Sequence, residues 1–238
     1  MRTSVEQRHL HDEVDPHVRG RWLSDLVLGA QDGLVNTLGV ALGVAAASGS
    51  ARLTFAAGLA AGVAEAISMA AVGYTSSMAR GDLYRAERAR EYRHLEAAPE
   101  VERDEIRQLY ANKGFRGPLL ERVVDTLCAD RDVWVAVMMS EEHRLCPVDR
   151  RASLRAAAVI GGASLLGALI PVLPFAILGS TLAVGASLAL GTAALFALGA
   201  FKAKVTTLAP GRGGAVLAAI GLASAAAGYA IGALLATG

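Results

Sequence analysis

The chain has 238 residues, 53% of them hydrophobic, and a formal net charge of +1, which points to no nucleic-acid partner. Its charged residues are strongly segregated. Residues 156–201 and 213–238 contain no Asp, Glu, Lys or Arg. Uncharged apolar runs of about 18 residues or more are long enough to cross the hydrocarbon core of a bilayer as helices. We therefore expect an all-α integral membrane protein.

The apolar runs predict five spanning helices. The uncharged stretch over residues 156–201 is too long for one span, and Pro171 and Pro174 predict a turn that divides it. The second helix meets no strong break and is expected to continue to about Ala97. The expected spans are residues 24–48, 53–78, 153–170, 175–200 and 213–236.

The basic residues predict the orientation of the chain in the membrane. Of the 23 Lys and Arg residues, 22 lie in the leader, in residues 80–155 or after the fourth span, and Arg52 alone lies on the other side. Positive charge accumulates on the cytosolic face. The N-terminus and the long charged insert are therefore expected in the cytosol. The expected divisions are a tail (1–22), two spans (23–79), a three-helix cytosolic domain (80–151) and three spans (152–238).

The insert reads as three amphipathic helices. The first continues the second span, the second covers about residues 100–113, and the third covers about residues 118–144. In the third, four apolar residues recur at helical spacing and predict a buried face. These are Leu120, Val123, Val124 and Leu127.

Two acidic residues fall inside predicted spans. Asp32 lies in the first span with Asn36 four residues later, and Glu65 lies in the second with Met69 four residues later. Residues at this spacing share one helix face. An intramembrane carboxylate indicates an ion or proton pathway, and a thioether beside one suits a transition metal. The alternatives are that Asp32 caps a broken helix near the interface and that Met69 only packs.

Acidic residues in the insert are also grouped at helical spacing. Glu87 and Glu91 share one helix face, Glu102 and Glu105 share another, and the third helix ends in MMSEEHR. Glu residues on facing helices, with a nearby His, hold iron in some helical bundles. Interleaved arginines offer another interpretation, a solvated surface with many ion pairs. Spacing alone favours the solvated surface.

Several stretches resemble the vacuolar iron transporter family, including its bacterial members. They are DLVLGAQDGLVNTLGVALGVA in the first span, AGVAEAISMAAVGYTSSMARGDLYRAERARE in the second, and EVERDEIRQLYANKGFRGPLLERVVDTLCADRDVWVAVMMSEEHRL in the insert. Together they cover residues 25–145, and the last three spans match in layout. The resemblance implies a homodimer of five-span protomers that moves Fe²⁺ out of the cytosol in exchange for protons.

The resemblance also implies roles for particular residues. Asp32 and Met69 would line a path between protomers. The insert would capture metal through Glu91, Glu102, Glu105, Met138 and Glu142, with Glu87 adjacent. His94 stands where relatives often carry another Glu, and it is a candidate ligand. Gly73 replaces a Glu that is usual in the family, which places the coupling mechanism and metal preference in question.

The expected function is therefore divalent iron export, with Fe²⁺ as cargo and no prosthetic group. An Mn²⁺ exporter of the same fold and a membrane-anchored metal-binding protein are the alternatives. An enzyme is not expected, because the sequence shows no catalytic constellation. Cys128 and Cys146 suggest no disulfide framework. His9, His11 and His17 are expected in a flexible tail, and the expected location is a bacterial plasma membrane.

Overall fold

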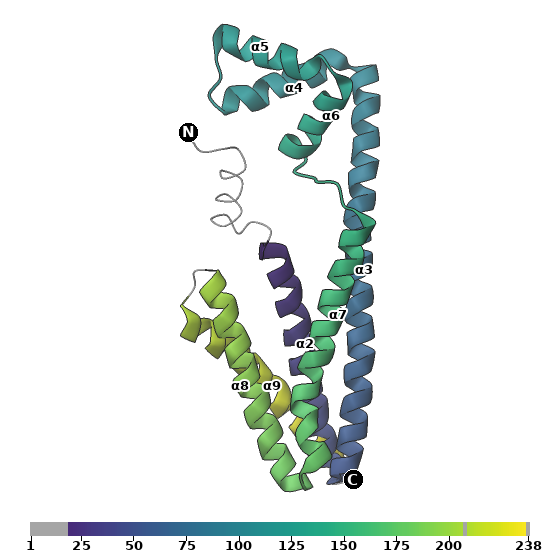
Figure 1. The fold of residues 1–238 in the computed structure, drawn as a ribbon, viewed down its shortest axis with the longest axis vertical. Helices are drawn as coiled ribbons and strands as arrows, with labels where there is room; N and C mark the ends of the chain where they lie inside the picture. The colour runs from purple at the N-terminus through teal and green to yellow at the C-terminus, as the bar shows by residue number, and fades with distance from the viewer. Residues whose placement is uncertain (1–18, 207–208, 237–238) are drawn as a thin grey trace, which may run out of the picture. The chain divides into compact units, whose positions relative to one another are not determined.

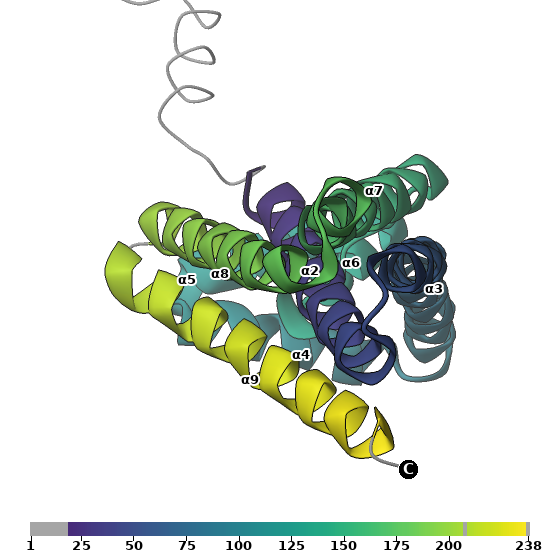
Figure 2. The same ribbon diagram turned by 90° about the horizontal axis from the view of Figure 1, so that it is seen from below.

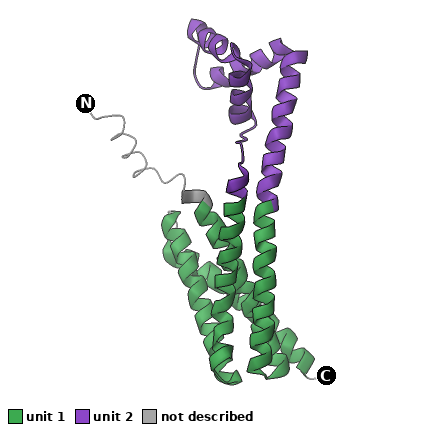
Figure 3. Cartoon of the chain, turned by 45° about the vertical axis from the view of Figure 1, so that its right-hand side comes forward, with its two compact units in different colours: residues 1–74, 154–238 green, residues 75–153 purple. Residues whose placement is uncertain are grey.

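The computed structural model describes residues 19–206 and 209–236, and these residues form helices and short connections without a strand. The chain divides into two compact units, coloured separately in Figure 3. We call the first the membrane unit; it comprises the described residues up to Tyr74 and from Leu154 onward. We call the second the insert unit; it comprises Thr75–Ser153.

Five helices are long and apolar enough to cross a membrane, which confirms the predicted number of spans. The long second helix continues through the predicted end of the second span, as expected, and ends at Ala97. The five helices, labelled in Figure 1, are α2 (Arg19–Ser48), α3 (Ala51–Ala97), α7 (Arg150–Ile177), α8 (Ser180–Val205) and α9 (Pro210–Ala236).

The predicted turn at the two prolines is wrong. Helix α7 continues through Pro171 and Pro174 and ends at Ile177, and the turn lies at Leu178 and Gly179. Proline is tolerated inside a spanning helix where neighbouring groups satisfy the freed backbone atoms. The hydroxyl of Ser187 on α8 donates to the carbonyl oxygen of Pro171 at 2.7 Å, which ties α8 to α7 beside the prolines.

Helix α2 lies between α7 and α9 in the membrane unit, as the end-on view in Figure 2 shows. A Cβ at Gly33 would collide with the backbone carbonyl of Ser164 on α7. Toward the other end of α2, Gly39 and Gly43 meet glycines of α9 backbone to backbone. Small residues allow this close approach, so the Gly/Ala-rich composition serves packing within one protomer.

The insert unit contains the end of α3, then α4 (Pro99–Asn112), α5 (Gly117–Cys128), α6 (Arg131–Val137) and the π-helical turn η1 (Met138–Glu142). The single third helix predicted for residues 118–144 is therefore wrong. It breaks at Ala129 and Asp130. The Asp130 carboxylate accepts hydrogen bonds from the backbone N–H groups of Asp132 and Val133, and this N-cap starts a new helix.

An apolar cluster holds these short helices together. It confirms the predicted buried face of α5, since Leu120 and Val124 are buried in it and Leu127 packs against it. Because the cluster joins α3, α4, α5, α6 and η1, it fixes the positions of the acidic residues beside it. Its buried members are Leu95, Ile106, Leu120, Val124, Trp134, Val135, Met138 and Met139.

Candidate metal centre

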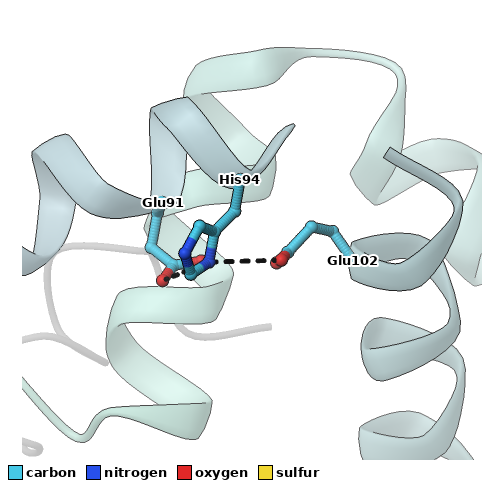
Figure 4. Close-up of side chains that lie close together, drawn as sticks. All are labelled: Glu91, His94 and Glu102. Carbon is cyan, nitrogen blue, oxygen red and sulfur yellow. Dashed lines mark ion pairs between the residues drawn. The ribbon is translucent and has the colours of Figure 1, made fainter. Parts of the chain in front are cut away.

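Three predicted ligands meet where α3 faces α4. Glu91 and His94 come from α3, one turn apart, and Glu102 comes from α4. One ligand atom from each lies within 4.8 Å of the others. His94 Nδ1 is 3.4 Å from Glu102 Oε1 and 3.8 Å from Glu91 Oε1. Figure 4 draws these ion pairs as dashed lines. This arrangement can surround a single divalent cation.

The two carboxylates are buried with little to balance their charge. Glu91 is 3% exposed and Glu102 is 5% exposed. Within the described residues, their only ion-pair partners are histidines, and neither meets a Lys or Arg. Buried charges in proteins are paired or coordinate a metal. Glu91 and Glu102 therefore have the chemistry of cation ligands.

Several arginines of the insert unit pair with other acidic residues. Arg103 binds Asp125, and Arg107 binds Glu121 at 2.9 Å. Arg131 binds Glu96 at 2.9 Å. The ion-paired surface that spacing favoured does exist, but it is separate from Glu91 and Glu102. One set of acidic residues in the insert therefore forms the ion-paired surface, and Glu91 and Glu102 remain as candidates for the metal site.

Two further predicted ligands, Glu105 and Glu142, influence this trio through their charges. Burial, followed by the charges of Glu105 and Glu91, raises the pKa of Glu102 to about 7, while His94 lowers it. Loss of hydration and the charge of Glu105 raise the pKa of Glu142, while His143 lowers it. Mutual repulsion of this kind requires the carboxylates to lie close together. Glu105 and Glu142 thus act electrostatically on the centre, while the group within 4.8 Å consists of Glu91, His94 and Glu102.

His143 joins the centre although it was not among the predicted ligands. Its Nε2 lies 3.0 Å from Glu91 Oε1, and its side chain is 26% exposed. The sequence signal was its place directly after Glu142. His143 directly follows the η1 turn, whose last hydrogen bond is donated by the His143 backbone N–H to the Met138 carbonyl.

Two other predicted ligands occupy different surroundings. Glu87 forms an ion pair with Arg90 at 2.9 Å. Met138 is 1% exposed and packs in the apolar cluster of the insert unit. Metal binding by either side chain stays a prediction.

In the membrane unit, the predicted path residues of α2 and α3 interact. Asn36 Nδ2 donates to Asp32 Oδ1 at 3.4 Å, so the two share a face as expected. The carboxyl groups of Asp32 and Glu65 lie within hydrogen-bonding reach of each other. The side chains of Asp32, Asn36 and Glu65 thus form one polar group. The helices around them, α2 and α3, are otherwise strongly apolar in the membrane unit.

A groove of about 640 Å³ lies beside this polar group, between α2, α3 and α9. Asn36, Thr37 and Glu65 line it together with Ser224 of α9. The Thr37 hydroxyl is buried and finds no hydrogen-bond partner among the described residues. The remaining lining residues are small or apolar.

Met69 and Gly73 lie further along α3. Met69 is half-buried and is not among the described residues that line the groove. Gly73 is buried against α7, and a Cβ there would lie 2.8 Å from Ile160 Cδ1 and 3.4 Å from Ala157 Cα. A side chain at position 73 would require the Ile160 side chain to shift, while the nearest backbone atoms of α7 stay at ordinary contact distance.

Cys128 is half-buried and Cys146 is exposed, and both are free thiols. His9, His11 and His17 lie outside the described residues.

The chain is similar to known proteins over almost its whole length. The model of the VIT family matches residues 23–233. Vacuolar iron transporter 1 of Arabidopsis thaliana is 31% identical over 97% of this chain and 94% of its own length. Vacuolar iron transporter 2 of Oryza sativa subsp. japonica is 32% identical over 93% and 92%. Protein CCC1 of Saccharomyces cerevisiae is 29% identical over 68% of this chain and 49% of its own length. With five membrane-spanning helices and these relatives, the chain is a multi-pass membrane protein that belongs to the VIT family.

Proposed function

We propose that this protein transports divalent iron, exporting Fe²⁺ from the cytosol in exchange for protons. The observation that carries the proposal is the pair of buried carboxylates, Glu91 and Glu102, with His94 between them and no Lys or Arg partner in the described chain. The relatives supply the context, since several are named vacuolar iron transporters.

The membrane unit supports movement of a cation as well as binding. Asp32, Asn36 and Glu65 offer oxygen ligands within helices that span the membrane. Charged groups at such positions usually mark an ion or proton pathway. These ligands would replace part of the hydration shell of Fe²⁺ as it crosses, and Met69 is a further predicted contact on the path.

The chemistry of the ligands supports exchange with protons as part of the proposal. A carboxylate must lose its proton to bind metal, so protons and metal compete for it. Because the pKa of Glu102 is raised to about 7, this competition falls in the physiological range. The distribution of basic residues places the insert unit, with its metal centre, on the side that we assign to the cytosol, and a centre that collects metal there supports export as the direction.

Transport into proteoliposomes tests the proposal directly. Full-length protein is reconstituted with a metal-quenched dye inside the vesicles, and Fe²⁺ is added outside under an imposed pH gradient. We expect Fe²⁺ entry that depends on the gradient and is accompanied by proton movement in the opposite direction. Metal binding without entry would support the membrane-anchored metal-binding protein instead. Faster entry of Mn²⁺ than of Fe²⁺ would support the Mn²⁺ exporter.

We propose that the protein assembles as a homodimer. Light scattering of the purified protein in detergent tests this assembly. The proposed location is a bacterial plasma membrane, with the N-terminus and the insert unit in the cytosol. Protease accessibility of the insert unit in sealed, right-side-out cells tests the orientation, and cleavage there would contradict it.

A further inference from the structure

Two imidazole rings approach the buried carboxylates of the metal centre from different segments. His94 belongs to α3, and its Nδ1 lies 3.4 Å from Glu102 Oε1. His143 follows η1, and its Nε2 lies 3.0 Å from Glu91 Oε1. In the described residues these histidines are the nitrogen-bearing side chains paired with Glu91 and Glu102. The centre thus presents nitrogen as well as oxygen atoms.

The backbone around His143 departs from the α-helix on both sides of that residue. The His143 N–H donates to the Met138 carbonyl five residues back, at 3.2 Å, which is the hydrogen bond of a π turn. Arg144 then adopts a left-handed conformation, with φ of 54°, and the Leu145 N–H donates to the Met139 carbonyl at 2.9 Å. Met138 and Met139 are anchored in the core, so this closed turn holds His143 beside the centre.

The separations between these atoms match those between ligands of one metal ion. Two ligands at about 2.1 Å from an ion and at right angles to each other are about 3 Å apart, and wider angles give up to about 4 Å. The three histidine–glutamate separations are 3.0, 3.4 and 3.8 Å. Ligand atoms of Glu91, His94 and Glu102 lie within 4.8 Å of one another, and His143 reaches the group through Glu91.

We infer that His94 and His143 make this a mixed nitrogen–oxygen centre that favours Fe²⁺ and the later divalent transition metals over Mn²⁺. The inference rests on the proposed function, because it concerns the selectivity of the same centre. Imidazole suits iron and the later metals, whereas Mn²⁺ is best held by oxygen ligands alone. A centre built only from the neighbouring glutamates would discriminate less between the two ions.

Metal titration of the full-length protein in detergent tests this selectivity. The starting protein carries Gln in place of His9, His11 and His17, so that the leader contributes no imidazole. Dissociation constants are measured for Mn²⁺ and for Co²⁺, an air-stable substitute for Fe²⁺. We expect tighter binding of Co²⁺, and we expect H94Q/H143Q to reduce the ratio of the two constants about tenfold. H143E should raise the affinity for Mn²⁺.

A spectroscopic measurement separates direct ligation from a hydrogen bond to Glu91. Pulsed electron paramagnetic resonance of bound Mn²⁺ detects the nitrogen of a coordinated imidazole. We expect this nitrogen signal in the starting protein, weaker in H143Q and absent in H94Q/H143Q. The exposed Glu100 provides the control, since E100Q should change neither the signal nor the ratio.

The possible failures are distinguishable. An unchanged nitrogen signal and an unchanged Co²⁺/Mn²⁺ ratio in H94Q/H143Q would overturn the inference while leaving the metal centre intact. Absence of metal binding in the starting protein would overturn both the inference and the proposed function.

Discussion

His94 Nδ1 lies 3.4 Å from Glu102 Oε1 and joins α3 to α4 across the helix break before Pro99. The helix break turns the chain back, so that residues eight positions apart in sequence face each other. Because Glu102 is almost fully buried, the contact places a negative charge where water cannot hydrate it well. A divalent cation bound there would relieve that cost.

Replacing Glu102 by Gln should weaken metal binding. The substitution keeps the shape of the side chain and removes the charged ligand, so we expect the affinity for Mn²⁺ or Co²⁺ to fall at least about tenfold. Titration calorimetry of the full-length protein measures this change. E100Q is the matched control, because Glu100 is exposed on the first turn of the same helix. Equal losses in both variants would contradict the assignment of Glu102 as a ligand.

The metal-free protein should lose stability as the pH rises. The pKa of Glu102 is raised from its usual value of 4.5 to about 7, so the folded state binds this proton more tightly than the unfolded state. The resulting stabilisation is fully present below about pH 4.5 and is lost as the pH rises through 7. We expect the Tm of the metal-free protein to be a few degrees lower at pH 8 than at pH 5.5.

E102Q isolates the contribution of this group to the pH dependence. The variant has no carboxyl group to titrate, so its Tm should vary less over the same range. Added metal should raise the Tm of the unmodified protein most at pH 8, where the carboxylates are charged. Fluorescence of Trp134, which is buried in the insert unit, follows the unfolding. The same pH dependence in both proteins would exclude Glu102 as its source.

Replacing Asp32 by Asn should abolish most Fe²⁺ transport and leave metal binding by the insert unit unchanged. The reason is that Asp32 interacts with Asn36 and Glu65 in the membrane unit, whereas the metal centre lies in the insert unit. We expect a reduction in initial flux of about tenfold or more, measured in proteoliposomes. D82N makes the same chemical change at an exposed residue that pairs with Arg85, and it should transport normally. Full flux in D32N would remove Asp32 from the path.

Adding a methyl group at Gly228 should destabilise the packing of α2 against α9. A Cβ at this position would collide with the backbone carbonyl of Gly39, and backbone atoms cannot move aside as a flexible side chain can. Overpacking of this kind costs about 1–3 kcal/mol. Thermal unfolding and size-exclusion profiles in detergent should show the loss for G228A. G185A is the control, since nothing lies within 4 Å of its added Cβ.

Much of the architecture follows from the sequence because its physical causes are local. Long uncharged runs specify spanning helices, and all five were predicted. The glutamates at helical spacing on α3 and α4 were likewise recognised as ligand candidates. The motifs around Asp32 and the insert also indicated the family, which the comparisons confirmed.

Helix boundaries and side-chain partners required the tertiary structure. The prolines of α7 predicted a turn, but the helix continues through both of them and packs against α8, where Ser187 donates to the Pro171 carbonyl. Spacing alone could not show which acidic residues pair with arginine and which are buried together, because that choice depends on contacts between helices distant in sequence. The approach of His143 to Glu91 depends on a π turn stabilised by the core, and helical periodicity does not encode it.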